Sequence, residues 1–291
     1  GIDIGPSTIA RVSQNEAYLD QFCAELADKE KEIRRLQRKL DRQRRANNPN
    51  NYNPDGTVKK GRKKWIKSKR YLQTQAQLAE IHRELAAHRR SLHGQLVNST
   101  LRMGDTFKLE NLSYKALQKL YGKSVNTRAP GRFVRELARK AESAGGTFVE
   151  FPTKTTRLSQ TCHCGRVPKK RLSERWHKCE CGATAQRDLY SAFLAMFVDP
   201  EANLLDAGLA KQAWPGADAL LRAAFEQAVK NQPASGRVIP ASFGYCRSLS
   251  GSPAEAGATD RTVGRAKTEA RDVVADPKRQ GESAGEVAVS R

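Results

Sequence analysis

Four of the six cysteines lie in one short stretch, and their spacing suits a bound metal ion. They form two Cys-x-Cys-Gly turns separated by a basic loop, at Cys162, Cys164, Cys179 and Cys181. Thiolates from two facing turns can complete the tetrahedral shell of a zinc ion. A glycine after each turn tolerates the backbone angles of a tight bend. The pattern therefore predicts a structural zinc ribbon, in preference to four reduced thiols without a metal.

The spacing within each turn leaves the ligand set open. Zinc ribbons usually carry Cys-x-x-Cys, so each turn here is one residue short. His163 and His177 flank the cysteines. Either imidazole is therefore an alternative ligand in place of one sulfur.

Three carboxylates at the ends of predicted elements form a second candidate site: Asp3, Glu110 and Asp188. Each has an ordinary explanation, because an acid is favoured in the first turn of a helix and tolerated on an exposed strand. An aspartate within a strand is nevertheless disfavoured. Three acids meeting at one end of a sheet can hold two Mg²⁺ ions roughly 3.5–4 Å apart, which promotes phosphodiester hydrolysis. Without a metal they would repel one another and raise each other's pKa.

The elements that must position these residues are strands alternating with helices. Strands are predicted at 1–5, 8–12, 106–110 and 147–151, and helices at 22–46, 66–102, 130–144 and 189–198, with two more helices within 202–230. Residues 124–131 are expected to form a loop. His82, His88 and His93 are expected at the surface or in a helix seam. This order predicts an α/β fold, with a mixed sheet covered by helices.

The charge pattern indicates a polyanionic partner. The net charge is +21, and acids are nearly absent between positions 58 and 78. A charge run is often only a solvated helix surface. Here the grouping favours a phosphate-contacting surface on the two long helices, because neutralising phosphates releases counterions.

Composition limits the remaining classes. With a mean hydropathy of −0.69, no run approaches the ~20 apolar residues of a membrane span. The cysteines fit a reducing compartment. Residues 232–291 are rich in Gly, Ala, Ser and charge, and are expected to be disordered. The sequence begins at Gly1 within a strand, so a missing N-terminal part is expected.

Three motifs, GIDIG, LENLS and CxCG…CxCGATAQRD, resemble those of the TnpB (OrfB) family of transposon-encoded proteins, over roughly residues 1–198. That family is similar to the compact type V CRISPR effectors. The resemblance implies an RNase H-like (RuvC-like) nuclease core with a helical-hairpin insertion and an inserted zinc ribbon. It also implies RNA-guided, Mg²⁺-dependent DNA cleavage, although older labels call family members transposases.

By the same resemblance, Asp3, Glu110 and Asp188 are the catalytic Mg²⁺ ligands, the four cysteines bind Zn²⁺, and the hairpin faces a guide RNA–target DNA duplex. DNA and a guide RNA are the expected partners, in the nucleoid-associated cytoplasm of a prokaryote. The implied divisions are 1–22, 105–160 and 186–200 for the core, 23–104 for the hairpin, 161–185 for the ribbon, 201–231 for extra helices and 232–291 for the tail.

The sequence departs from the family pattern at Gln186, where Asp is usual, and at Tyr190, where Asn is common. These departures bear on the fine geometry of the site. A catalytically idle nucleic-acid-binding remnant, which loss of the N-terminal part would produce, is a second hypothesis. A DNA-strand transferase is a third and weaker one, because no Tyr or Ser with an adjacent base stands out.

Overall fold

The computed structural model describes residues 1–171 and 173–231. All of them lie in the first of two compact units, Gly1–Arg247. The tail expected to be disordered, residues 232–291, lies outside the described residues. Within the described residues, no helix is both long and apolar enough to cross a membrane.

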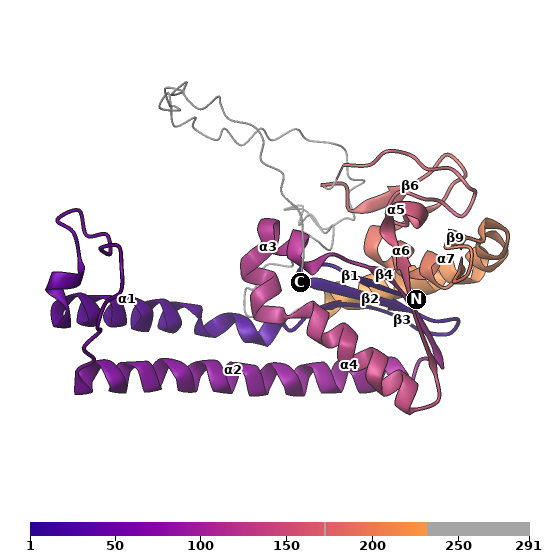
Figure 1. The fold of residues 1–291 in the computed structure, drawn as a ribbon. Helices are drawn as coiled ribbons and strands as arrows, with labels where there is room; N and C mark the ends of the chain where they lie inside the picture. The colour runs from indigo at the N-terminus through magenta and orange to yellow at the C-terminus, as the bar shows by residue number, and fades with distance from the viewer. Residues whose placement is uncertain (172, 232–291) are drawn as a thin grey trace, which may run out of the picture. The chain divides into compact units, whose positions relative to one another are not determined.

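A five-stranded mixed sheet is the centre of this unit (Figure 1). From edge to edge its strands are β3 (Ala17–Gln21), β2 (Thr8–Val12), β1 (Ile2–Ile4), β4 (Thr106–Asn111) and β5 (Thr147–Pro152). The β1, β2 and β3 strands run antiparallel, whereas β1 with β4 and β4 with β5 are parallel pairs. The mixed α/β class expected from the sequence is confirmed.

Strand periodicity sorts the side chains between the two faces of the sheet. Because successive residues point to opposite sides, Ile2 and Ile4 face one layer and Asp3 faces the other. The two isoleucines join a buried cluster with residues of α2 (Lys69–Leu101) and α4 (Pro130–Ser143). The opposite face is covered by α6 (Arg187–Ala195) and α7 (Ala207–Lys230), whose apolar residues form a second cluster with β2 and β3.

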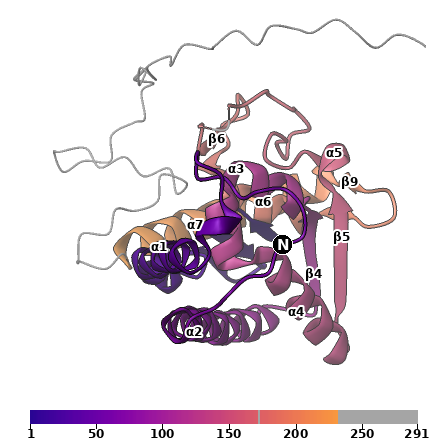
Figure 2. The ribbon, with the colours of Figure 1, turned by 60° about the vertical axis from the view of Figure 1, so that its left-hand side comes forward.

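Two long helices, α1 (Glu30–Asn47) and α2, lie side by side and are seen nearly end-on in Figure 2. A short 3₁₀ helix (Ala24–Lys29) leads into α1, and another (Pro49–Asn51) follows it. Asn48 fixes the connection, because its side chain accepts from Ile66 N–H at 2.7 Å and donates to the Ile66 carbonyl at 3.0 Å. The tip of the hairpin is therefore an ordered loop.

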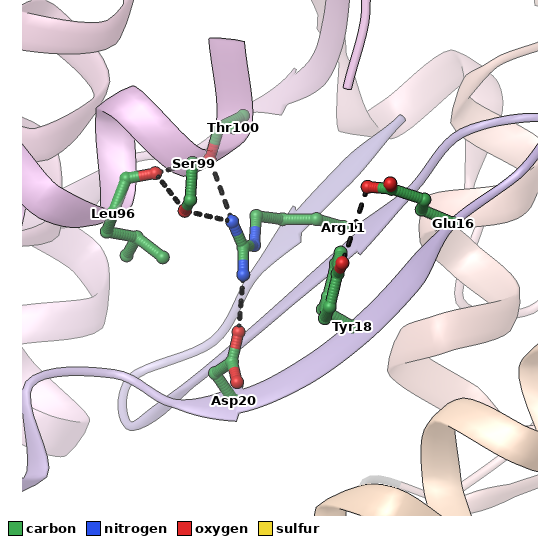
Figure 3. A network of polar contacts seen from close by, with 7 residues as sticks. All are labelled: Arg11, Glu16, Tyr18, Asp20, Leu96, Ser99 and Thr100. Atoms are coloured by element: carbon green, nitrogen blue, oxygen red, sulfur yellow. Dashed lines mark hydrogen bonds and ion pairs between the residues drawn. The ribbon is translucent and has the colours of Figure 1, made fainter. Parts of the chain in front are cut away.

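Arg11 fastens the far end of α2 to the sheet (Figure 3). Its buried guanidinium donates to the hydroxyls of Ser99, at 2.7 Å, and Thr100, at 3.2 Å. It also pairs with Asp20 on β3 at 2.7 Å. Because Arg11 is only 5% exposed, these partners offset the cost of removing a charge from water.

Two local predictions were wrong. Residues expected to form a loop, from Ser124 to Arg128, are the end of helix α3 (Tyr114–Arg128). The two helices expected within 202–230 are one helix, α7, which continues through Pro215. Proline removes one helical hydrogen bond, but Trp214 and Leu221 on either side of it pack on the second cluster. Tertiary packing has overridden the local break.

The ribbon lies between β5 and α6. After the four-residue helix α5 (Thr153–Thr156) come the short antiparallel strands β6 (Trp176–Lys178) and β7 (Thr184–Gln186). A further small pair, β8 (Val198–Asp199) and β9 (Leu204–Leu205), separates α6 from α7. The β7 strand runs directly into α6, so the ribbon is continuous with the helix that carries Asp188.

Candidate functional site

The two cysteine turns have the same backbone geometry. In the first turn, Gly165 N–H donates to the Cys162 carbonyl at 2.9 Å, and in the second, Gly182 N–H donates to the Cys179 carbonyl at 3.0 Å. The two glycines adopt φ values of 85° and 91°, which side chains with a Cβ rarely tolerate. Each turn therefore presents two sulfurs on one side of the chain.

The four sulfurs converge. All lie within 4.8 Å of one another. Cys162 and Cys181 are 3.5 Å apart at sulfur, and Cys164 and Cys179 are 3.6 Å apart. A zinc ion with four sulfurs at ~2.3 Å has a sulfur–sulfur edge of about 3.8 Å, so the cluster can hold zinc after small shifts of the sulfurs. Burial raises the pKa of the Cys162 thiol to about 12, so metal binding must displace a proton there.

Neither histidine belongs to this four-sulfur group. His163 Nδ1 lies 2.8 Å from the hydroxyl of Tyr190. His177 is fully buried, stacks on the Tyr190 ring at 4.0 Å between centroids, and contacts the Lys170 ammonium through Nδ1. The cysteines alone therefore supply a complete ligand set, and a substitute imidazole is not needed.

The three predicted acids lie on one face of the sheet. Ile2 of β1 is in register with Leu109 of β4, so the next residues, Asp3 and Glu110, are level with each other on the opposite face. Helix α6 packs on β1, β2 and β4 and carries Asp188 in its first turn. The Gln186 side chain caps this helix by accepting from Leu189 N–H at 2.8 Å.

Polar neighbours hold two of the acids. Thr8 on β2 donates to Asp188 Oδ2 at 3.3 Å, and Arg187 Nε lies 3.5 Å from Asp188 Oδ1. Glu110 Oε1 accepts from the Thr156 hydroxyl and from Leu158 N–H, both at 3.3 Å. Sequence reasoning missed these hydroxyl and amide partners, because they come from segments 46 to 180 positions away along the chain.

The electrostatics of Asp3 connect the three acids. Burial raises the pKa of Asp3 well above its usual value, and repulsion from Asp188 and then Glu110 raises it further. Burial also raises the pKa of Glu110, against the hydrogen bonds from Leu158 and Thr156. The carboxylates are close enough to interact. Within residues 1–171 and 173–231, however, the cysteines are the only group of three or more potential ligands gathered within 4.8 Å.

The hairpin tip combines cations with aromatic rings. Its exposed basic residues are Lys59, Lys60, Arg62, Lys64, Lys67, Lys69 and Arg70. Arg44 lies over the Trp65 ring at 5.4 Å, and Arg45 over the Tyr52 ring at 4.8 Å. The sequence indicated the charge but not these stacked pairs, which require the loop to fold back on α1.

A comparison with known protein families matches the segment that contains the ribbon. The family model described as "Cas12f1-like, TNB domain" matches residues 131–194. No curated protein matches the chain. The matched residues contain all four cysteines and Asp188. The match shows that this segment is similar to the TNB domain of Cas12f1-like proteins.

Proposed function

We propose that this chain is a metal-dependent DNA endonuclease with a RuvC-like core, directed to its target by a guide RNA. The observation that carries the proposal is the raised pKa of Asp3, because Asp188 and Glu110 contribute to it by repulsion. A buried carboxyl group that two further acids repel is part of a site that a cation would stabilise. The cysteine cluster then has a structural role, as the support of α6.

The donor set fits magnesium. Mg²⁺ prefers carboxylate oxygens and keeps several waters, so Asp3, Glu110 and Asp188 would hold it. When bound, divalent ions supply Lewis acidity and a water of lowered pKa for hydrolysis of a phosphodiester. The chain's own residues orient the ligands: Thr8 holds Asp188, and Thr156 with the Leu158 amide holds Glu110.

Nucleic acid as the substrate is supported by charge. The net charge of +21 and the exposed cations at the hairpin tip suit a phosphate backbone. Cleavage of DNA and guidance by RNA are inferred from the resemblance of the three motifs to the TnpB family. The match over residues 131–194 supports the same family.

A second candidate is a nucleic-acid-binding protein without catalysis. It is favoured by the spread of the acids, since no three carboxylates of the described residues gather within 4.8 Å. Such a protein would bind DNA or RNA through the hairpin and ribbon but would not cut either.

A cleavage assay separates the two candidates. We expect Mg²⁺-dependent cutting of single-stranded DNA by the wild type and its loss in Asp3→Ala and in Asp188→Ala, with binding retained. Glu84→Ala, at an exposed position on α2, is the matched control and should cut normally. Salt-sensitive binding without cutting by any form would support the second candidate. RNA recovered with the purified protein, and required for cutting of duplex DNA, tests guidance.

A further inference from the structure

Tyr190 lies between the cysteine cluster and the helix that carries Asp188. It is on α6, is 1% exposed, and its hydroxyl reaches the first cysteine turn. The hydroxyl oxygen is 3.3 Å from Cys162 Sγ, 3.0 Å from the backbone nitrogen of His163 and 2.8 Å from His163 Nδ1. The family resemblance leads us to expect Asn at this position, which could not make the same ring contacts.

Counting hydrogens decides what the hydroxyl does. A phenol has one hydrogen to donate and accepts up to two. The His163 backbone N–H can only donate, so it occupies one acceptor site on the oxygen. If Nδ1 of His163 carries the ring hydrogen, it occupies the second site. The phenolic hydrogen then has Cys162 Sγ as its acceptor, at 3.3 Å.

The other arrangement uses longer contacts. If the hydroxyl instead donates to His163 Nδ1, the ring hydrogen moves to Nε2, which lies 4.0 Å from Cys181 Sγ. That distance is at the limit for a hydrogen bond to sulfur, whereas the contact between the hydroxyl and Cys162 is 0.7 Å shorter. A metal-bound thiolate accepts and cannot donate, which also favours donation from the phenol.

We propose that Tyr190 donates a hydrogen bond to the Cys162 sulfur and is a positioning residue that connects the cysteine cluster to α6. The ring is fixed for this role by stacking on His177 at 4.0 Å and by an edge contact with Trp214 at 5.2 Å. Hydrogen bonds to metal ligands set ligand orientation and metal affinity.

The bond has a structural consequence. The second cysteine turn is already joined to α6 through β7, and Tyr190 joins the first turn to the same helix. A metal ion bound by the four cysteines would therefore hold α6 through both turns. Asp188, which precedes Tyr190 by two residues, is positioned by the same contacts.

The test compares Tyr190→Phe with wild type in the full chain reconstituted with cobalt or zinc. We expect Tyr190→Phe to bind zinc about tenfold more weakly in competition with a chromogenic chelator. The sulfur-to-cobalt charge-transfer band should shift, because one sulfur loses a hydrogen-bond donor. Tyr114→Phe is the matched control, since its buried hydroxyl has no hydrogen-bond partner among the described residues and lies outside the cysteine cluster. It should change neither quantity.

The outcomes are distinct. A charge-transfer band identical to wild type would overturn the proposal, even with weaker zinc binding, because packing alone would explain that loss. If Tyr190→Phe fails to fold, His163→Phe replaces it. This variant keeps the phenol and should retain the wild-type band, whereas a shifted band would assign the hydrogen bond to the imidazole and overturn the proposal. None of these measurements depends on DNA cleavage.

Discussion

The hydroxyl of Thr8 donates a hydrogen bond of 3.3 Å to the carboxylate of Asp188 and so joins β2 to α6. Thr8 is 2% exposed, and Asp188 is 8% exposed. The two residues are 180 positions apart along the chain. The acid therefore depends on a strand at the opposite end of the described sequence for its orientation.

Thr8→Val tests this dependence, because it removes the hydroxyl and keeps the shape. A hydrogen bond to a charged group contributes about 1.5–3 kcal/mol, so we expect the Mg²⁺ needed for half-maximal cutting to rise roughly tenfold or more. Thr8→Ser keeps the hydroxyl and should stay near wild type. Equal magnesium requirements for both variants would show that Thr8 does not orient Asp188.

Asp3→Asn is expected to stabilise the metal-free protein. The pKa of Asp3 is raised by burial and by repulsion from Asp188 and Glu110, so the folded state favours the protonated acid. The protonated acid therefore contributes to the free energy of unfolding below the unfolded pKa of about 3.9. This contribution is lost as the pH rises through the folded pKa. Thermal unfolding at pH 7 should therefore give a higher Tm for Asp3→Asn.

The same variant tests the metal site. Added Mg²⁺ should raise the Tm of the wild type, because a ligand that binds only the folded state stabilises it. Asp3→Asn should gain much less. An equal gain in the two proteins would place magnesium elsewhere.

The lowered pKa of His93 predicts that the protein loses stability in mild acid. Burial lowers the pKa of His93 and outweighs the 2.9 Å contact of Nε2 with the Arg128 carbonyl, which raises it. Arg89 and Arg132 lower the pKa further. The folded state favours the neutral ring, so stability is lost as pH falls below the unfolded pKa of about 6.5. The difference in free energy of unfolding between pH 7 and pH 5, measured with denaturant, should be smaller for His93→Gln than for the wild type. His82→Gln, at an exposed position on the same helix, is the control.

Purified protein should contain one zinc ion per chain, held by the four-sulfur group. Elemental analysis should find far less zinc in Cys179→Ser, because three sulfurs leave the tetrahedral shell open. Near-ultraviolet circular dichroism should change as well, since Tyr190 and Trp214 pack beside the cluster. Full zinc content in Cys179→Ser would exclude the four-cysteine site.

The hairpin tip should contribute to nucleic-acid affinity without sequence preference. Replacing Lys60, Lys64 and Lys67 by alanine should reduce the slope of log affinity against log salt by up to about three. All three side chains are exposed. Replacing Lys211, Arg222 and Lys230 on α7 by alanine removes the same charge and should leave the slope nearly unchanged. An equal effect from both sets would indicate attraction by net charge alone.

The sequence predicted the features that rest on short-range pattern. Alternation around Asp3 placed it opposite Ile2 and Ile4, and the two Cys-x-Cys-Gly turns predicted the sulfur cluster. It could not predict Thr8, Thr156 or Tyr190 as partners, because each meets its partner through tertiary packing. His93, expected at the surface or in a seam, is 2% exposed beside Phe22 and Phe133.

Arg11 connects the helical hairpin to the strand that pairs with Asp3. Helix α2 has 33 residues and so is about 50 Å long. Its final turn is pinned to β2, whose residue Ala10 pairs with Asp3. The helix is also held along its C-terminal half, where Leu85, Leu92 and Val97 pack in the core and His93 contacts the Arg128 carbonyl. One continuous helix thus joins the hairpin tip to the strand that pairs with Asp3.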